Sequence, residues 1–469
     1  MSKTKDLVKN TGIIGIGKLS SQIVTFLLLP LYTSILSSAE YGTVDLILSY
    51  IQLLLPIVNL QLDQALFRFL VNKREDRSEC RTIISTMAFF SVIQLVVYIG
   101  IFGVVQLFID NRYKWFFLLN IICSVYSSFM SNCSRGRGHN MSYSIQSFIG
   151  VLMNILLNIL FLVFVKMGAN GMLLASALSS VCSGTYGLFS NKAYSFFSLS
   201  AVDRSRIKEF YAYSVPLIPN QLSWWIMKAS DKTVINIFVS IAANGLIAVA
   251  SKFSSAYIMV YNLFNMAWAE SVVLHINDKD GKQYIEKTVN STFNIFFCLC
   301  ISVISFMPFV YRFFVPNAEY SDAYGLIPIY MTAVFFNVIV GLYSALYVAN
   351  KDTKAIAVTS GVSAAVNITA DLMLVGVIGV YAAPVSTALG FAVIMVYRYF
   401  HSRKYMVVKL EMKNILGALA VGSLVIALYY INYTAANILS AAVSVAYALI
   451  FNRDIIKSCI STIKKRAAR

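Results

Sequence analysis

The chain has 469 residues, of which 58% are hydrophobic and only 13% are charged. Soluble domains carry about 25% charged residues, so this composition excludes a soluble globular fold of such length. The net charge is +17 at pH 7, but the distribution of basic residues described below indicates membrane topology rather than nucleic-acid binding. The seven cysteines and three histidines show no spacing typical of a metal or catalytic cluster.

Apolar runs near 20 residues in length predict an all-α integral membrane protein with about 14 transmembrane helices. The N-terminal run continues past Pro30 without a cleavage site, so we interpret it as a retained helix rather than a signal peptide. The predicted spans are 10–34, 43–70, 82–108, 115–134, 141–165, 170–190, 210–238, 244–272, 288–314, 324–349, 355–377, 380–400, 414–431 and 435–452.

The first two spans carry polar and charged residues on one helical face. Charge in the hydrocarbon region is costly, so such residues usually face a bundle interior or an aqueous cavity. In the first span this face holds Gly15, Lys18, Gln22 and Thr25. In the second span a continuous stripe is predicted, and a second stripe with Gln61, Gln64 and Arg68 lies beside it. The continuous stripe comprises Asp45, Ser49, Gln52, Pro56, Asn59 and Asp63.

The seventh and eighth spans repeat this chemistry. Pro216 and Pro219 are expected to kink or unwind the start of the seventh span. Its predicted polar face holds Asn220, Trp224, Lys228 and Asp231, and that of the eighth span holds Lys252, Ser255, Asn262 and Asn265. The last two spans carry no embedded charge and are interpreted as an accessory pair.

The basic residues predict the orientation of the chain. Roughly three quarters of the Lys and Arg fall in loops on one side, which the positive-inside rule assigns to the cytoplasm. The opposite side holds only Arg112, Lys114, Lys166 and Arg312. Both termini are therefore predicted to be cytoplasmic.

An internal repeat divides the chain. Asn154 and Asn158 precede the small-residue segment 168–178, and Asn367 and Asp371 precede the similar segment 379–389. Two copies of six helices would have the same orientation in the membrane. We therefore expect two pseudo-symmetric lobes, at 1–190 and 210–400, a cytoplasmic linker at 191–209, and the accessory pair with a basic tail at 401–469.

These features resemble a known group of transporters. The motifs Ser37–Gly42 and Arg137–Tyr143, the two prolines of the seventh span, Asp231–Lys232 and the Asn repeats are similar to those of Wzx-type oligosaccharide flippases. These belong to the multidrug/oligosaccharidyl-lipid/polysaccharide (MOP) superfamily. The resemblance implies a MATE-like fold, alternating access and movement of an undecaprenyl-pyrophosphate-linked oligosaccharide from the inner to the outer leaflet of a bacterial plasma membrane. It also implies, as partners, membrane lipids and the glycosyltransferases and polymerase of one polysaccharide biosynthesis pathway.

Candidate site residues follow from the stripes and the resemblance. The pyrophosphate needs cations, here Lys18, Lys252, Arg68 and Lys228, and the lysines at 18 and 252 occupy places comparable to cavity cations of related flippases. Amides and an aromatic ring for the sugars are offered by Gln22, Gln52, Asn59, Asn220, Trp224, Asn262 and Asn265. Candidates for coupling to Na⁺ or H⁺ are Asp63, Asp231 and Asp371, and no other cofactor, no bound metal and no catalytic residue is expected.

Some of these residues could have a structural role instead of a functional one. For Asp63 we favour an ion pair with Arg68, and for Lys228 and Asp231 mutual neutralisation one turn apart, whereas Trp224 could equally pack in the core. The alternative function is a cation-coupled multidrug exporter of the same superfamily, which the cationic residues near the helix centres disfavour. A membrane enzyme such as a polymerase is excluded because every predicted external loop is short.

Overall fold

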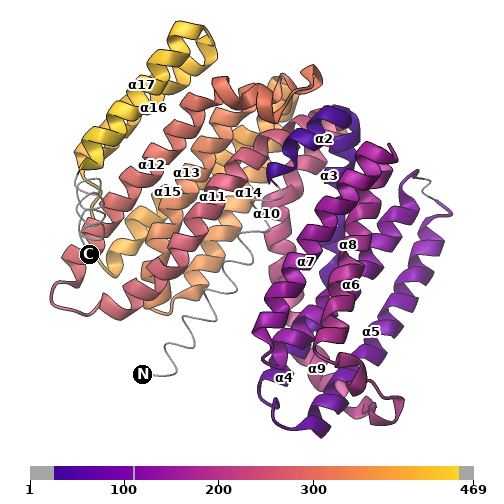
Figure 1. Cartoon of the computed structure of the whole chain (residues 1–469). Helices are drawn as coiled ribbons and strands as arrows, with labels where there is room; N and C mark the ends of the chain where they lie inside the picture. Colours follow the sequence, from indigo (N-terminus) through magenta and orange to yellow (C-terminus); the bar gives the residue numbers. More distant parts are fainter. Residues whose placement is uncertain (1–25, 109–110, 454–469) are drawn as a thin grey trace, which may run out of the picture. The chain divides into compact units, whose positions relative to one another are not determined.

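The computed structural model describes residues 26–108 and 111–453, and every regular element within them is helical. The chain divides into two compact units, Met1–Thr233 and Val234–Arg469, which are described separately (Figure 1). The helices of the first unit are α2 (Leu29–Ile35), α3 (Ser38–Val58), α4 (Leu62–Val71), α5 (Arg77–Val105), α6 (Lys114–Gly136), α7 (Asn140–Asn158), α8 (Ala169–Ser190), α9 (Ile207–Ser214) and most of α10 (Ile218–Phe238).

The second unit begins near the end of α10 and contains seven further long helices. These are α11 (Ile241–His275), α12 (Gly281–Phe314), α13 (Ala323–Ala349), α14 (Thr353–Ile378), α15 (Ala382–His401), α16 (Met412–Ile431) and α17 (Thr434–Phe451). Helix α13 packs between α11 and α15, α14 packs on α15, and α12 contacts α16 and α17.

The predicted all-α membrane fold is confirmed. Eleven segments of the described residues are long and apolar enough to cross a membrane, and one of them, Lys354–Lys404, contains both α14 and α15. Helix α10 is not among them because of its polar residues, and most of the predicted first span lies outside the described residues. The count of fourteen therefore stays a prediction.

The predicted second span, 43–70, is not one helix, so this prediction is wrong. A capping box between Ser37 and Glu40 starts α3. The helix ends at Val58, and Leu60 and Gln61 adopt left-handed backbone conformations with φ of 46° and 55° before α4 begins. Pro56, which lacks an amide hydrogen, lies in the last turn of α3 and weakens the helix there. The polar stripe is therefore divided into two parts.

The hydrophilic segment 191–209 is packed rather than loose. Ala193 and Phe196 are buried in an apolar cluster with residues of α4, α5, α6 and α9. Ser85 of α5 donates to the carbonyl of Phe196 at 2.8 Å and accepts from the amide of Ser198 at 3.0 Å. The segment is thus part of the first unit. The expected lobe boundaries remain a proposal, because compactness groups neighbouring helices and does not test the repeat.

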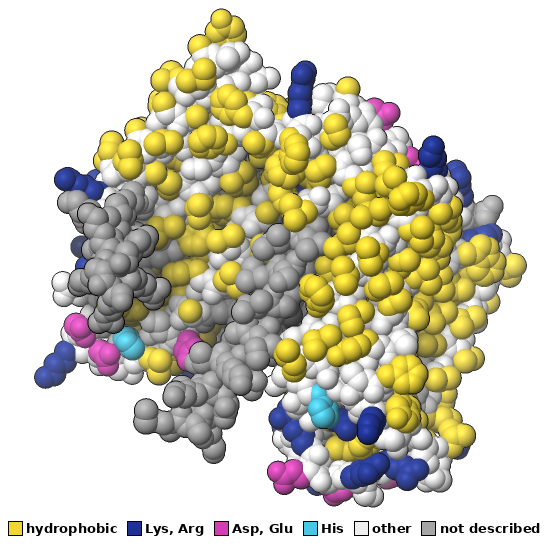
Figure 2. All heavy atoms as spheres, in the orientation of Figure 1, with side chains coloured by type: hydrophobic (Ala, Val, Ile, Leu, Met, Phe, Trp, Pro, Cys, Tyr) yellow, Lys and Arg dark blue, Asp and Glu magenta, His cyan; other side chains and the backbone are white. Residues whose placement is uncertain are grey.

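Loops predicted on one side meet at one end of each unit. In the first unit, Arg74 donates to the carbonyl of Gly136 at 2.7 Å, and Arg137 donates to that of Asn191 at 2.8 Å. In the second unit, Lys404 pairs with Asp352 at 3.0 Å. Figure 2 shows hydrophobic side chains over much of the visible surface, with Lys and Arg mainly toward the ends of the helices. This distribution suits helices that cross an apolar layer.

Candidate functional site

A largely buried ion pair joins α3 and α10 within the first unit. The Lys232 ammonium lies 2.7 Å from the Asp45 carboxylate and donates to Ser49 Oγ at 2.9 Å. The Trp225 indole donates to the backbone carbonyl of Ser49 at 2.6 Å, and the Tyr50 hydroxyl lies 3.1 Å from that of Thr233. Only 18% of either charged side chain is exposed. The pair therefore neutralises two charges that would be costly in the membrane.

Asp63 is the centre of a second polar cluster in the first unit. Its carboxylate accepts hydrogen bonds from Asn59 at 2.8 Å, Ser128 at 2.6 Å and Asn132 at 3.0 Å, and from Gln64 at 3.3 Å. All four donors are uncharged. The carboxylate also lies in the first turn of α4, where the helix dipole favours an anion. Asp63 thus links the turn between α3 and α4 to α6 through hydrogen bonds.

The ion pair considered between Asp63 and Arg68 is absent. The carboxylate of Asp63 is turned to α6, and the side chain of Arg68 is exposed. The left-handed turn before α4 explains the error, because it changes the face on which Asp63 lies. Two buried amide oxygens, of Asn59 and Gln61, have no hydrogen-bond partner near this turn. The cluster is thus rich in oxygen atoms, as a site for a small cation or a proton would be.

The two Asn repeats make similar contacts in their own units. In the first unit Asn154 of α7 lies 3.4 Å from the hydroxyl of Ser179 in α8. In the second unit Asn367 of α14 lies 3.3 Å from the hydroxyl of Ser386 in α15. Asp371, one turn beyond Asn367, is fully buried. The same pairing of consecutive helices thus recurs in both units, although the two serines lie at different positions of the predicted repeat.

The structure places the other predicted residues as follows. In the second unit Lys252 is half-buried, Asn262 is exposed, and Asn265 accepts a hydrogen bond from Tyr261 at 3.1 Å. Gln52 is exposed, and Asp231 is buried. Lys18 and Gln22, and the side chains of Asn220, Trp224 and Lys228, lie outside what the structure describes.

Sequence reasoning missed the residues of α10 that contact α3. It selected the face with Asn220 and Trp224, whereas Trp225 and Lys232 make the contacts. It also gave no role to Arg398, which lies at the end of the predicted span 380–400. This residue is 3% exposed in the last turn of α15, where its guanidinium donates to Thr359 at 2.9 Å, to the carbonyl of Ile356 at 3.3 Å and to Ser344. The signal for Arg398 was its position at the end of an apolar helical run.

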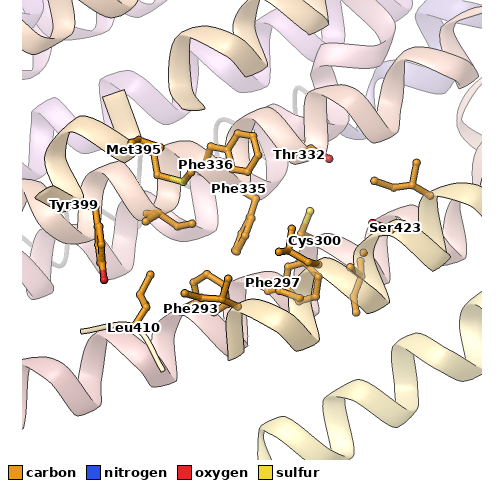
Figure 3. A pocket seen from close by; sticks show the side chains of 18 of the residues that line it. Phe293, Phe297, Cys300, Thr332, Phe335, Phe336, Met395, Tyr399, Leu410 and Ser423 are labelled. Carbon is orange, nitrogen blue, oxygen red and sulfur yellow. The ribbon is translucent and has the colours of Figure 1, made fainter. Parts of the chain in front are cut away.

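An apolar cleft of about 520 Å³ lies in the second unit between α12, α13, α15 and α16 (Figure 3). Phe293, Phe297 and Phe335 line its centre, and Met395 and Tyr399 lie at one end. Thr332 and Ser423 are its few polar residues. Such a lining suits a hydrocarbon chain, because it offers apolar contacts and almost no hydrogen-bond donors.

A known protein family matches this chain. A sequence model of a family described as "Polysaccharide biosynthesis protein" matches residues 7–269, more than half of the chain. No match is found among curated proteins.

Solved structures with the same fold are transporters and a flippase. The lipid II flippase MurJ in an inward closed conformation has a TM-score of 0.68 and 17% identity, over 94% of this chain and 99% of that one. An inward-facing MATE family multidrug transporter of the MOP superfamily has a TM-score of 0.67 and 14% identity, over 83% and 97%. An outward-facing MATE transporter has a TM-score of 0.56 and 13% identity, over 84% and 95%. At these identities the likeness establishes the fold alone.

Proposed function

Because the chain belongs to the polysaccharide biosynthesis protein family, we propose that it is a flippase for a lipid-linked oligosaccharide. The substrate class is an undecaprenyl-pyrophosphate-linked repeat unit, moved from the inner to the outer leaflet of a bacterial plasma membrane by alternating access. The family match is the observation that carries this proposal. The MurJ fold supports it, because that protein is a flippase for a lipid-linked molecule.

The two chemical halves of such a substrate have counterparts in the chain. The polyprenyl tail needs an apolar path, and the cleft lined by Phe293, Phe297 and Phe335 offers one. The pyrophosphate needs cations where water is scarce, and the half-buried Lys252 is the described candidate. Lys18 is proposed as the second cation from the sequence pattern alone.

Coupling to an ion gradient is proposed at the buried carboxylates. Asp63 lies among uncharged donors and two unpartnered amide oxygens at a helix break, a setting that transporters use for Na⁺ or H⁺. Asp231 and Asp371 are also buried. The pathway partners, glycosyltransferases and a polymerase, are proposed from the family alone.

The test is the leaflet distribution of the substrate in cells. Polyprenyl-linked oligosaccharide is labelled with a membrane-impermeant reagent and counted by mass spectrometry for the normal protein, Lys252→Ala and Lys18→Ala. We expect the outward share to fall about tenfold in each variant, the loss expected for one charge-assisted hydrogen bond. Lys354→Ala, which removes an exposed cation, is the control and should transport normally.

An unchanged leaflet distribution when the whole gene is deleted would overturn the flippase proposal. If such a deletion instead raised the retention of a cationic dye, the multidrug-exporter alternative would replace it. Normal transport by both lysine variants, with loss of transport on deletion, would refute only the assignment of the two cations.

A further inference from the structure

A second, polar cleft lies in the second unit, where the start of α12, the start of α16 and the end of α17 meet. Its volume is about 950 Å³. Four asparagines of low exposure line it: Asn290, Asn294, Asn414 and Asn452. The transport proposal uses none of them.

The asparagines are held in place by specific hydrogen bonds. Asn290 donates to the carbonyl of Lys409 at 2.9 Å, and its own oxygen accepts from the amide of Glu411 at 2.8 Å and from Asn414 at 3.2 Å. Asn294 accepts from the hydroxyl of Tyr447 at 3.3 Å. The polar lining is thus a built feature that links α12 to α16 and α17.

Two acceptors in this lining have no hydrogen-bond partner. They are the side-chain oxygens of Asn414, which is 1% exposed, and Asn452, which is 7% exposed. A buried amide oxygen without a donor costs free energy, so such atoms usually receive a hydrogen bond from a ligand or from water. Hydroxyl groups of a ligand would supply the missing donors.

The rim of the cleft carries more cations than anions. Five basic side chains line it against three carboxylates, and the Lys413 ammonium pairs with Glu411 at 2.8 Å. The basic residues are Lys279, Lys282, Lys287, Lys413 and Arg453, and the acids are Asp280, Glu286 and Glu411. The excess of positive charge favours a ligand with a phosphate group.

The length and charge of α12 place the cleft at the level of lipid headgroups. Helix α12 has 34 residues, and at 1.5 Å per residue it is about 51 Å long, whereas the hydrocarbon core is about 30 Å thick. Its first turns carry Lys282, Glu286 and Lys287, so this is the end that extends beyond the hydrocarbon. Phosphate headgroups are the abundant anions of that layer.

We propose that this cleft binds the headgroup of an anionic glycerophospholipid, such as phosphatidylglycerol. The phosphate lies among the rim lysines, and the glycerol hydroxyls donate to the oxygens of Asn414 and Asn452. The bound lipid would bridge α12 to the accessory pair α16 and α17. This site is independent of the transport proposal, because lipid retention is measured without turnover.

The test is native mass spectrometry of the full-length protein released from detergent after incubation with defined lipids. We expect phosphatidylglycerol to be retained and phosphatidylcholine to be lost. Lys282→Ala/Lys287→Ala should reduce bound phosphatidylglycerol by about tenfold or more, since each surface cation contributes to holding an anionic headgroup. The matched control is Lys351→Ala/Lys354→Ala, which removes two exposed cations of the same unit outside the cleft.

A second variant tests the asparagine lining. Phosphatidic acid lacks the glycerol hydroxyls, so the normal protein should retain phosphatidylglycerol more strongly than phosphatidic acid. Asn452→Leu keeps the size of the side chain and removes the acceptor. This variant should therefore retain the two lipids equally. Its melting temperature is measured alongside to show that it folds. Equal retention of phosphatidylglycerol and phosphatidylcholine, or equal losses in both lysine pairs, would overturn the proposal. If free glycerol phosphate raised the melting temperature of the protein as much as phosphatidylglycerol does, the proposal would also be overturned, and the ligand would be a soluble phosphate ester.

Discussion

At the scale of single residues, the charges inside the predicted spans fall into two kinds. Asp45 and Lys232 satisfy each other across two helices, whereas Asp63 is surrounded only by uncharged donors. A paired charge is chiefly structural, because its partner offsets the cost of burial. A carboxylate without a cation beside it can exchange a proton or bind a cation more readily. Asp63 is therefore the better candidate for coupling.

Breaking the pair between Asp45 and Lys232 should destabilise the protein strongly. Lys232→Met leaves a largely buried carboxylate without its cation, and we expect a loss of about 3 kcal/mol in the free energy of unfolding. Thermal unfolding in detergent measures this. Asp45→Asn/Lys232→Met should recover part of the loss, and Lys354→Met should have little effect. If Lys232→Met were as stable as the normal protein, the pair would not stabilise the fold.

Asp352 predicts a pH dependence outside the membrane-spanning segments. Hydrogen bonds from Tyr405, the amide of Ala355 and Lys404 lower the pKa of its carboxyl to about 2. Because the folded pKa lies below the ordinary value of 3.8, the stabilisation is present above about pH 4 and is lost as the pH falls towards 2.

The measurement compares the normal protein with Asp352→Asn between pH 2 and pH 6. The variant should melt at a lower temperature at pH 6, and the difference should shrink towards pH 2. A difference that stayed constant with pH would refute the titration of this carboxyl. Asp278→Asn, at an exposed acid of the same unit, is the control.

At the scale of elements, the turn between α3 and α4 interrupts what the sequence predicts as one helix. Leu60 and Gln61 both have positive φ, a conformation that costs non-glycine residues roughly 1–2 kcal/mol. The turn persists because Asn59 and Asp63, on either side of it, are hydrogen-bonded to each other. It marks the start of the segment fastened to α6.

Substitutions at Gln61 test this strain. Gln61→Gly should be neutral or stabilising, because glycine adopts positive φ without cost. Gln61→Val should destabilise by about 1–2 kcal/mol, since a β-branched side chain tolerates that backbone poorly. Melting temperatures of both variants give the answer. If Gln61→Val melted above Gln61→Gly, the left-handed turn would not exist in solution.

The sequence could predict helices but not their contacts. Hydropathy located the span 324–349 within one residue of α13 and matched the end of α12 at 314 but not its polar start, since apolar length is a local property. The break at Leu60 was not predicted because part of its support comes from hydrogen bonds that Ser128 and Asn132, distant in sequence, donate to Asp63. The contact of Lys232 with Asp45 was missed for the same reason.

At the scale of the whole molecule, the family resemblance and the fold were predicted correctly, and the roles of individual residues were less accessible. The motifs around Ser37 and Pro216 indicated a polysaccharide export family; the family match shows the polysaccharide biosynthesis protein family, and the MurJ and MATE structures share the fold. The polar stripes selected residues by face alone. Whether a side chain such as Gln52 or Asn262 is exposed depends on neighbours that no stripe reveals.

The packed segment 193–206 has a consequence for how such a chain can change length over evolution. Its Phe196 belongs to a core, and its backbone is hydrogen-bonded to Ser85 and Thr86. An inserted or deleted residue there would shift Phe196 out of that core. Natural insertions should instead accumulate in exposed turns such as Asn432–Tyr433. If the two predicted lobes arose by gene duplication, the length of the segment that joins them would therefore have been constrained from an early stage.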